Sequence, residues 1–251
     1  MIKSVEKAFR LLEILSEARE PMRLRDVSAA AEMTRSNALR MLQTLQELGY
    51  VRQAEGSSLY EMSLKAFQIG ASRVSQDGLV TAAHPIVQEL ADKVEANVLL
   101  SVRDGAHCVV VDRIESRAFV RTFAHLGARE PLQAVSAGKV LLAYSSAAVF
   151  EMVAANLAPL TPRTIVTREA LEAEMEKVRA QGFATTEGEV KQDAKGIAVP
   201  VRGRLGDVVA ALTASGPLAQ MSDEELHRYV ALLRDHAARI EAAWPGGLNQ
   251  G

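Results

Sequence analysis

Apolar residues recur with a helical period in the first part of the chain. In residues 4–18 one helix face is apolar and the other carries charged residues, which predicts an amphipathic helix. Pro21 breaks the pattern, and a short helix with an apolar inward face follows. The apolar positions of these two helices are Val5, Ala8, Phe9, Leu12 and Leu15, and then Leu24, Val27 and Ala31.

A third helix is predicted over residues 35–48. Thr34 is suited to be its N-cap, because a threonine hydroxyl accepts a backbone N–H from the next turn. Gly49 is suited to end it, because glycine readily adopts the left-handed conformation that follows many helices. We expect leucines at intervals of three to hold this helix to the core, namely Leu39, Leu42, Leu45 and Leu48.

Two short strands follow this helix, at residues 50–53 and 58–61, and they flank a turn around Gly56. Three helices followed at once by a hairpin are typical of a winged helix-turn-helix, in which the third helix enters the DNA major groove. Arginine, asparagine and glutamine read base edges there. The candidate DNA-contacting residues are Arg35, Ser36, Asn37, Arg40, Gln43 and Thr44 on the helix and Arg52 on the hairpin.

The pattern divides the chain into a DNA-binding domain at 1–62, a linker helix at 63–77 and a larger domain at 78–251. The linker helix has too little apolar surface to stand alone, so we expect it to pack on a partner or a neighbouring subunit.

Alternating helices and hairpin-connected strands in the larger domain predict an α+β fold with a mainly antiparallel sheet. Helices are expected at 83–96, 138–144, 168–181 and 221–243, the last opened by a capping box of Ser222 and Glu225. Strands are expected at 98–102, 107–114, 119–123, 183–186, 196–201 and 208–215.

Charge limits how the first domain binds DNA. Residues 1–62 carry nine Lys or Arg and nine Asp or Glu, and the whole chain has a net charge of −2. Any DNA contact must therefore come from a local basic patch. A single neutral winged helix would bind weakly, so we expect a dimer that reads two half-sites of double-stranded DNA.

Composition indicates the compartment. One cysteine excludes an intrachain disulfide, which fits a reducing environment. No apolar run approaches the roughly 18 residues needed to span a membrane, and the first residues lack the apolar stretch of a signal peptide. We expect a cytoplasmic protein without membrane contact.

Motifs along nearly the whole chain resemble the IclR family of bacterial transcriptional regulators. They are Ser4–Ala8 with Leu11–Leu15, Arg35–Leu45 with Gly49–Val51, Tyr60–Met62, Ser136–Ala143, Glu189 with Gly196–Val201, and Leu212–Pro217. The resemblance implies a winged helix-turn-helix, a linker helix and a GAF-like effector-binding domain. It also implies a homodimer or a dimer of dimers, and small organic acids or aromatic catabolites as effectors.

The resemblance also implies an effector site, at positions that correspond here to Ser136, Ala137, Thr186, Gly196, Thr213 and Ser215. Residues 136–139 open a helix, and free N–H groups with a positive dipole end favour an anion there. This sequence departs from the family, which often has an acid at 186, a cysteine at 196 and a serine at 213. We infer a larger or less polar pocket, and our hypothesis for the effector is a carboxylate with an apolar body. For Thr213 and Ser215 the alternative is hydrogen bonding within the fold.

Other side chains form no catalytic or metal-binding pattern. His107 and Cys108 are adjacent on a predicted strand and point to opposite faces, and Cys108 is expected to be buried and inert. The histidines lack metal-ligand spacing, so we expect no metal and no cofactor. Glu187 and Glu189 would share a strand face as paired carboxylates, but a solvated face is favoured. A charged helix surface is expected from Glu172, Glu174, Glu176 and Lys177.

The leading interpretation is a DNA-binding transcriptional regulator whose operator affinity a small organic acid modulates. The alternative is an enzyme that uses the C-terminal pocket and has the N-terminal helices as an oligomerisation arm. It would need a convergent acid, base or nucleophile, which the sequence does not offer. An architectural DNA-binding protein without a ligand would leave the large second domain unexplained.

Overall fold

The computed structural model describes residues 2–18, 20–75, 78–116 and 125–244. The chain divides into two compact units, Met1–Arg73 and Val74–Gly251, each with its own hydrophobic core. The division falls inside α4 (Lys65–Ser75), the helix predicted as a linker. Within the described ranges, no helix combines the length and apolar character needed to cross a bilayer.

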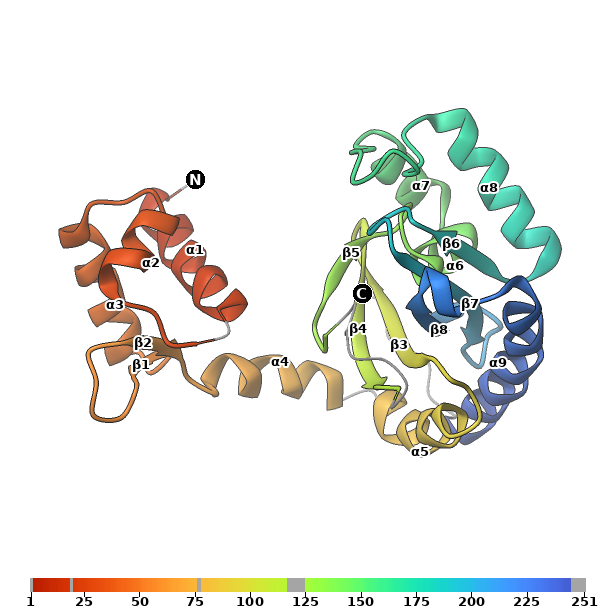
Figure 1. The fold of residues 1–251 in the computed structure, drawn as a ribbon, viewed down its shortest axis with the longest axis horizontal. Coiled ribbons are helices and arrows are strands. Elements are labelled where there is room, and N and C mark those ends of the chain that lie inside the picture. Colours follow the sequence, from red (N-terminus) through yellow and green to blue (C-terminus); the bar gives the residue numbers. More distant parts are fainter. Residues whose placement is uncertain (1, 19, 76–77, 117–124, 245–251) are drawn as a thin grey trace. The chain divides into compact units, whose positions relative to one another are not determined.

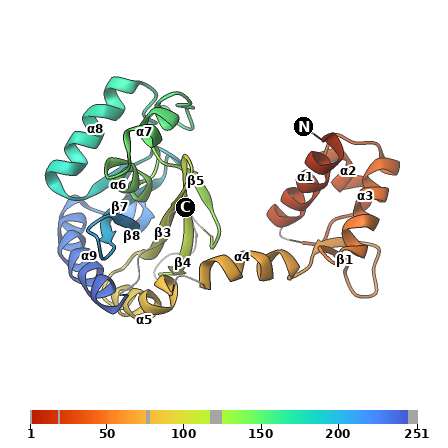
Figure 2. The same cartoon turned by 180° about the vertical axis from the view of Figure 1, so that it is seen from behind.

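The first unit has the predicted order of three helices and a hairpin (Figures 1 and 2). Its elements are α1 (Lys3–Glu17), α2 (Leu24–Ala30), α3 (Arg35–Glu47), β1 (Val51–Gln53) and β2 (Tyr60–Met62). The second strand begins at Tyr60, later than the predicted residue 58, and Tyr60 pairs on two sides. It lies opposite Gln53 in the hairpin, and its backbone exchanges hydrogen bonds of 2.7 and 2.8 Å with Met22.

Both predicted ends of α3 are confirmed. The backbone N–H of Asn37 donates to Thr34 Oγ1 at 3.4 Å, and Gly49 adopts a left-handed φ of +79°. Leu42 and Leu45 are buried, but Leu48 is 53% exposed, so the prediction that it anchors the helix is wrong. Successive residues turn by about 100°, so a spacing of three drifts by about 180° between Leu39 and Leu48.

The buried face of α1 is centred on Leu11, Ile14 and Leu15. Of the apolar positions predicted to share a face, Leu15 is buried, whereas Val5 and Phe9 are exposed. The first unit thus keeps an apolar surface on α1 that its own core does not use.

The second unit is an α+β domain with an antiparallel sheet, as the sequence predicted, and its six strands follow the order β5–β4–β3–β8–β7–β6. Its strands are β3 (Asn97–Asp104), β4 (His107–Ile114), β5 (Arg129–Pro131), β6 (Ala184–Glu187), β7 (Ala194–Arg202) and β8 (Val208–Pro217). The strand β5 and the helix α7 (Ala147–Ala154) were not predicted. The strand predicted at 119–123 lies outside the described residues.

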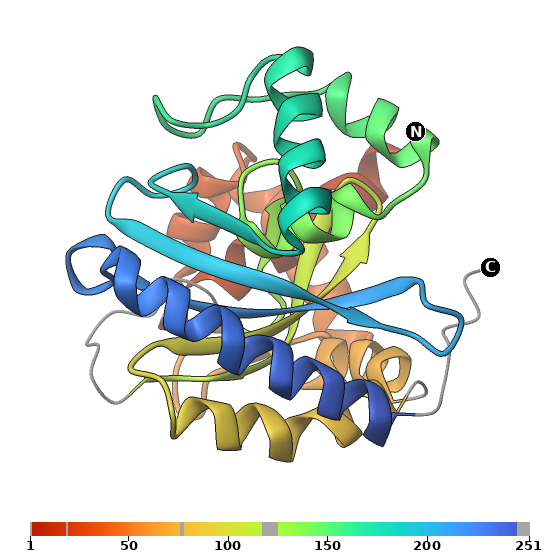
Figure 3. The same cartoon turned by 90° about the vertical axis from the view of Figure 1, so that its right-hand side faces the viewer.

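Helices cover both faces of this sheet (Figure 3). On one face α5 (Leu79–Ala91) and α9 (Asp223–Ala243) lie side by side, and the predicted capping box of Ser222 and Glu225 opens α9. On the other face lies α6 (Ser136–Ala143), with α8 (Arg168–Gln181) packed against it. Alternate strand positions supply the two cores: Leu212 packs toward α5 and α9, and Ala211 toward α6.

Candidate functional site

The predicted DNA-reading side of α3 is open to solvent. Arg35, Ser36, Arg40, Gln43 and Thr44 are all exposed, and Asn37 is half-buried. The helix has one buried side, formed by Ala38, Leu42 and Leu45. The polar side is therefore available within this unit, and its contact with DNA remains a prediction.

Local hydrogen bonds orient two residues of this polar side. Arg40 Nη2 donates to Asn37 Oδ1 at 2.9 Å, and Thr44 Oγ1 donates to the Arg40 carbonyl oxygen at 3.0 Å. On the hairpin, Arg52 Nε lies 2.8 Å from Glu61 Oε1 while its side chain stays largely exposed. An exposed ion pair of this kind contributes little stability, so Arg52 can exchange Glu61 for a phosphate at small cost.

Asn37, Arg40 and Thr44 also line an open groove between α3, α1 and α4. Its apolar wall includes Val5 and Phe9 from α1 and, next to the end of α3, Leu48. These three polar residues therefore adjoin an apolar surface, whereas Arg35, Ser36 and Gln43 lie outside the groove.

The six residues predicted to contact an effector line one cavity of about 100 Å³ in the second unit. They are Ser136, Ala137, Thr186, Gly196, Thr213 and Ser215. Strand register explains how they meet: Gly196 pairs with Thr186 on one side and with Ser215 on the other. Thr213 lies two residues from Ser215 along β8, hence on the same sheet face. That this cavity binds an effector remains a prediction.

The N-terminus of α6 forms one wall of the cavity. Val135 is its N-cap and, among the described residues, no side chain caps this end. The first-turn N–H groups, which helix geometry leaves without intrahelical acceptors, can therefore bind a ligand. Close packing fixes the helix here, because a Cβ atom on Gly138 would lie 2.4 Å from the Leu132 carbonyl oxygen.

Gly196 keeps the cavity open beside this helix. A Cβ atom at this position would lie 3.3 Å from Ser136 Oγ and 3.4 Å from Ser215 Cβ. The glycine therefore provides room between the two serines.

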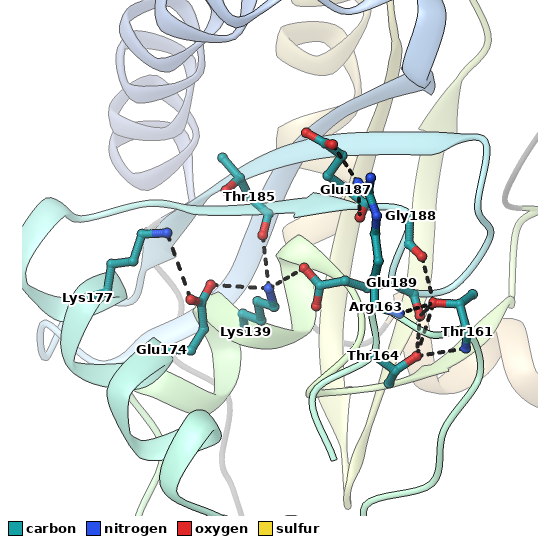
Figure 4. Close-up of polar contacts among 10 residues, drawn as sticks. All are labelled: Lys139, Thr161, Arg163, Thr164, Glu174, Lys177, Thr185, Glu187, Gly188 and Glu189. Atoms are coloured by element: carbon teal, nitrogen blue, oxygen red, sulfur yellow. Dashed lines mark hydrogen bonds and ion pairs between the residues drawn. The ribbon is translucent and has the colours of Figure 1, made fainter. Parts of the chain in front are cut away.

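A buried charge cluster adjoins the cavity (Figure 4). Lys139 on α6 has a side chain only 3% exposed, and its Nζ lies 2.7 Å from Glu189 Oε1 and 3.1 Å from Glu174 Oε1. Its third hydrogen bond goes to the carbonyl oxygen of Thr185 at 3.1 Å. The ammonium group is thus fully paired in a place that water hardly reaches.

This cluster corrects two expectations. Glu189 does not lie on a solvated face with Glu187: it turns inward to Lys139 and lines the cavity, while Glu187 is exposed and pairs with Arg163. Glu174 does not belong to a charged helix surface either, since its side chain is 15% exposed. The sequence placed Glu189 in a family motif, but only the tertiary structure shows its partner.

Burial dominates the titration of Glu189. Desolvation raises its pKa above the ordinary value, although the neighbouring Lys139 opposes this shift. Desolvation likewise raises the pKa of Glu130, another residue at the cavity that the sequence did not single out.

Cys108 also lines the cavity, from β4. It is buried, and desolvation raises the pKa of its thiol to about 12. Because the thiolate is the nucleophilic form, this cysteine is unreactive near neutral pH, as expected from the sequence. Together with Leu99 and Val110 it gives the cavity an apolar wall.

Comparison with known proteins identifies the family. The model described as "IclR helix-turn-helix domain" matches residues 4–55, and that described as "Bacterial transcriptional regulator IclR C-terminal" matches residues 71–242. The chain is 34% identical over 243 residues to the HTH-type transcriptional regulator KdgR of Escherichia coli, covering 96% of this chain and 92% of the relative.

Solved structures agree with this result. A putative transcriptional regulator from a Rhodococcus species superposes with a TM-score of 0.79 at 31% identity, over 97% of this chain and 98% of the other. An IclR homologue from Microbacterium hydrocarbonoxydans, complexed with 4-hydroxybenzoate, has the same fold, with a TM-score of 0.79 at 24% identity over 96% and 98% of the two chains.

The curated relatives are named as regulators or repressors, so the alternative of an enzyme is set aside. The chain belongs to the IclR family of bacterial transcriptional regulators, with an N-terminal helix-turn-helix DNA-binding domain.

Proposed function

We propose that a small organic carboxylate binds in the cavity at the N-terminus of α6 and thereby changes the affinity of the regulator for its operator. The observation that carries this proposal is that the six residues expected at the effector site come together at a single cavity from α6, β6, β7 and β8. Their contributions are Ser136 and Ala137, Thr186, Gly196, and Thr213 with Ser215.

The chemistry of the cavity favours an anion with an apolar part. Uncapped N–H groups and the positive end of the α6 dipole attract a carboxylate. The hydroxyl groups of Ser136 and Ser215 add donors beside it, and Leu99 and Val110 accommodate the apolar part. The small volume favours a compact acid.

The N-terminal unit would read double-stranded operator DNA through α3 and the hairpin, as part of a homodimer or a dimer of dimers. Exposed apolar side chains support self-association: Phe9 is 61% and Leu48 is 53% exposed, and both line the groove beside α3. Covering Phe9 and Leu48 with a second copy would remove these side chains from water, and the dimer would present two α3 helices to one DNA. Sedimentation of the full chain tests the assembly.

Fluorescence anisotropy on the regulator's own upstream DNA tests the function. Wild-type protein is titrated with and without candidate carboxylates, beginning with 4-hydroxybenzoate, which is bound to the Microbacterium homologue. We expect at least one acid to shift the DNA affinity, and Gly196→Val to bind DNA normally without responding. An unchanged DNA affinity in the presence of every acid, in wild type and variant alike, would contradict the proposal.

A further inference from the structure

Two threonine hydroxyls join the connection between α7 and α8 to the turn that follows β6 (Figure 4). Thr161 Oγ1 donates to the carbonyl oxygen of Gly188 at 2.7 Å. Thr164 Oγ1 donates to the carbonyl oxygen of Glu189 at 2.6 Å, and Thr164 as a whole is only 6% exposed. We call these two threonines the threonine clasp, because they hold two consecutive peptide groups that lie 27 and 25 residues farther along the chain.

The clasp hydroxyls have fixed roles in these contacts. A hydroxyl group has one proton to donate and two lone pairs that accept. Thr164 Oγ1 accepts the backbone N–H groups of Leu160 and Thr161 at 3.1 and 2.9 Å. Its proton is left to donate, and the Glu189 carbonyl oxygen is a nearer acceptor than Thr161 Oγ1, which lies at 3.4 Å. Thr161 Oγ1 likewise accepts the N–H of Arg163 at 3.1 Å. Both hydroxyls are therefore oriented donors.

The two segments come into close contact at Gly188. Its φ of +70° is left-handed, a conformation that favours glycine. A Cβ atom there would lie 3.2 Å from Arg163 Cδ. Arg163 also pairs with the residue before the glycine, since its Nη1 lies 2.5 Å from Glu187 Oε1. A glycine at 188 therefore lets the turn lie close to the α7–α8 connection.

The clasped turn forms part of the cavity wall. Glu189, Val190 and Lys191 all line the cavity, whereas the clasp threonines stand behind this wall and are not among its lining residues. The same Glu189 whose carbonyl oxygen the clasp binds reaches Lys139 on α6 with its carboxylate, at 2.7 Å. The main-chain position of Glu189 therefore determines where this wall lies relative to the N-terminus of α6.

We infer that Thr161 and Thr164 are positioning residues for effector binding: by holding the backbone at Gly188 and Glu189, they set the affinity of the cavity. Without the clasp, the turn would sample conformations in which Glu189 no longer pairs with Lys139. Only the fraction of molecules with a formed wall would bind, so the apparent dissociation constant would rise. This inference rests on the proposed function, because it concerns the same cavity.

Valine and serine variants separate the hydroxyl group from the shape of the side chain. Thr161→Val and Thr164→Val remove the clasp hydroxyls but keep a β-branched side chain. Thr161→Ser and Thr164→Ser keep the hydroxyls. Thr167→Val is the matched control, because it removes a hydroxyl from the same connection. Thr167 Oγ1 caps α8 by accepting the N–H of Ala170 at 3.3 Å, so its loss costs stability without a lost bond to the turn.

Amide hydrogen exchange of the full-length protein without ligand tests the contact. The amides of Gly188 and Ala194 close the turn through hydrogen bonds of 2.8 and 3.0 Å. In the valine variants of the clasp we expect peptides covering residues 186–195 to exchange about tenfold faster, the size of one lost hydrogen bond. Peptides from β3 and β8 should keep their rates, and Thr167→Val should leave the turn unchanged. Unchanged exchange in the turn, or equal acceleration throughout the domain, would refute the clasp.

Calorimetric titration tests the effect on binding. The probes are propionate, benzoate and 4-hydroxybenzoate, and the acid that wild type binds most tightly is used with every variant. We expect Thr161→Val and Thr164→Val to bind it about tenfold more weakly. The serine variants and Thr167→Val should keep the wild-type affinity.

The outcomes distinguish the inference from the proposed function. If the valine variants of the clasp bind the acid as tightly as wild type, the inference is wrong and the proposed carboxylate site stands. If Thr167→Val weakens binding as much as they do, the effect is one of general stability and the inference is wrong. If no acid binds to wild type, the carboxylate site falls and the inference falls with it, whatever the exchange rates.

Discussion

Lys139 Nζ donates to Glu189 Oε1 at 2.7 Å, which joins α6 to the segment that follows β6. Neither partner is in bulk water, since their side chains are 3% and 12% exposed. A buried pair of this kind adds little net stability compared with apolar residues, but removing one partner leaves an uncompensated charge. The pair therefore fixes the geometry of the cavity wall.

The first prediction concerns Lys139→Met. This substitution leaves Glu174 and Glu189 buried without their cation, so we expect a loss of about 3–5 kcal/mol in the free energy of unfolding near neutral pH. Urea unfolding followed by circular dichroism measures it, with the exposed Lys177→Met as the control. A loss for Lys139→Met no larger than that of the control would contradict this role.

The second prediction concerns pH. Burial raises the pKa of Glu189 in the folded state, so its contribution to stability is fully present below its ordinary pKa of 4.5 and is lost as the pH rises toward the folded value. Glu189→Gln removes this contribution. Compared with wild type, the variant should therefore gain relative stability as the pH rises above about 4.5. Denaturant unfolding at several pH values measures the difference, and a change in the opposite direction would refute the assigned sign.

The third prediction concerns Gly138→Ala. The added Cβ would meet the backbone of Leu132, which cannot move as easily as a side chain. We expect a destabilisation of about 1–3 kcal/mol, typical of overpacking, and weaker acid binding because the first turn of α6 shifts. Chemical unfolding and calorimetry measure the two effects. An unchanged unfolding midpoint would show that the backbone around Leu132 can move to accommodate the added Cβ atom without a loss of stability.

The fourth prediction concerns DNA. Arg40→Ala removes a side chain from the polar side of α3, so specific binding should weaken and sequence preference should relax. Arg52→Ala on the hairpin should weaken binding to all sequences and flatten its salt dependence, as expected of a phosphate contact. Anisotropy titrations on specific and scrambled DNA at several salt concentrations distinguish the two. Wild-type binding by both variants would mean that the DNA-reading surface lies elsewhere.

Local patterns predicted much of this molecule. Thr34 and Gly49 marked the ends of α3, and Ser222 with Glu225 marked the start of α9, because caps depend on residues close in sequence. The error at Leu48 came from counting leucines by threes instead of following the true helical period. Such an error is avoidable from the sequence alone.

The charge cluster could not be predicted in the same way. Glu174 and Glu189 meet Lys139 from segments 35 and 50 residues away along the chain. Each looks like an ordinary surface charge within its own helix or loop. Only the packing of α8 and β6 against α6 makes these residues buried partners.

The structure of the regulator crystallised with the carboxylate that it binds most tightly tests the central claim most directly. We predict the ligand's carboxylate on the N–H groups of Ser136 and Ala137, and its apolar part against Leu99 and Val110. Ligand density outside this cavity, or a carboxylate that points away from α6, would contradict the account.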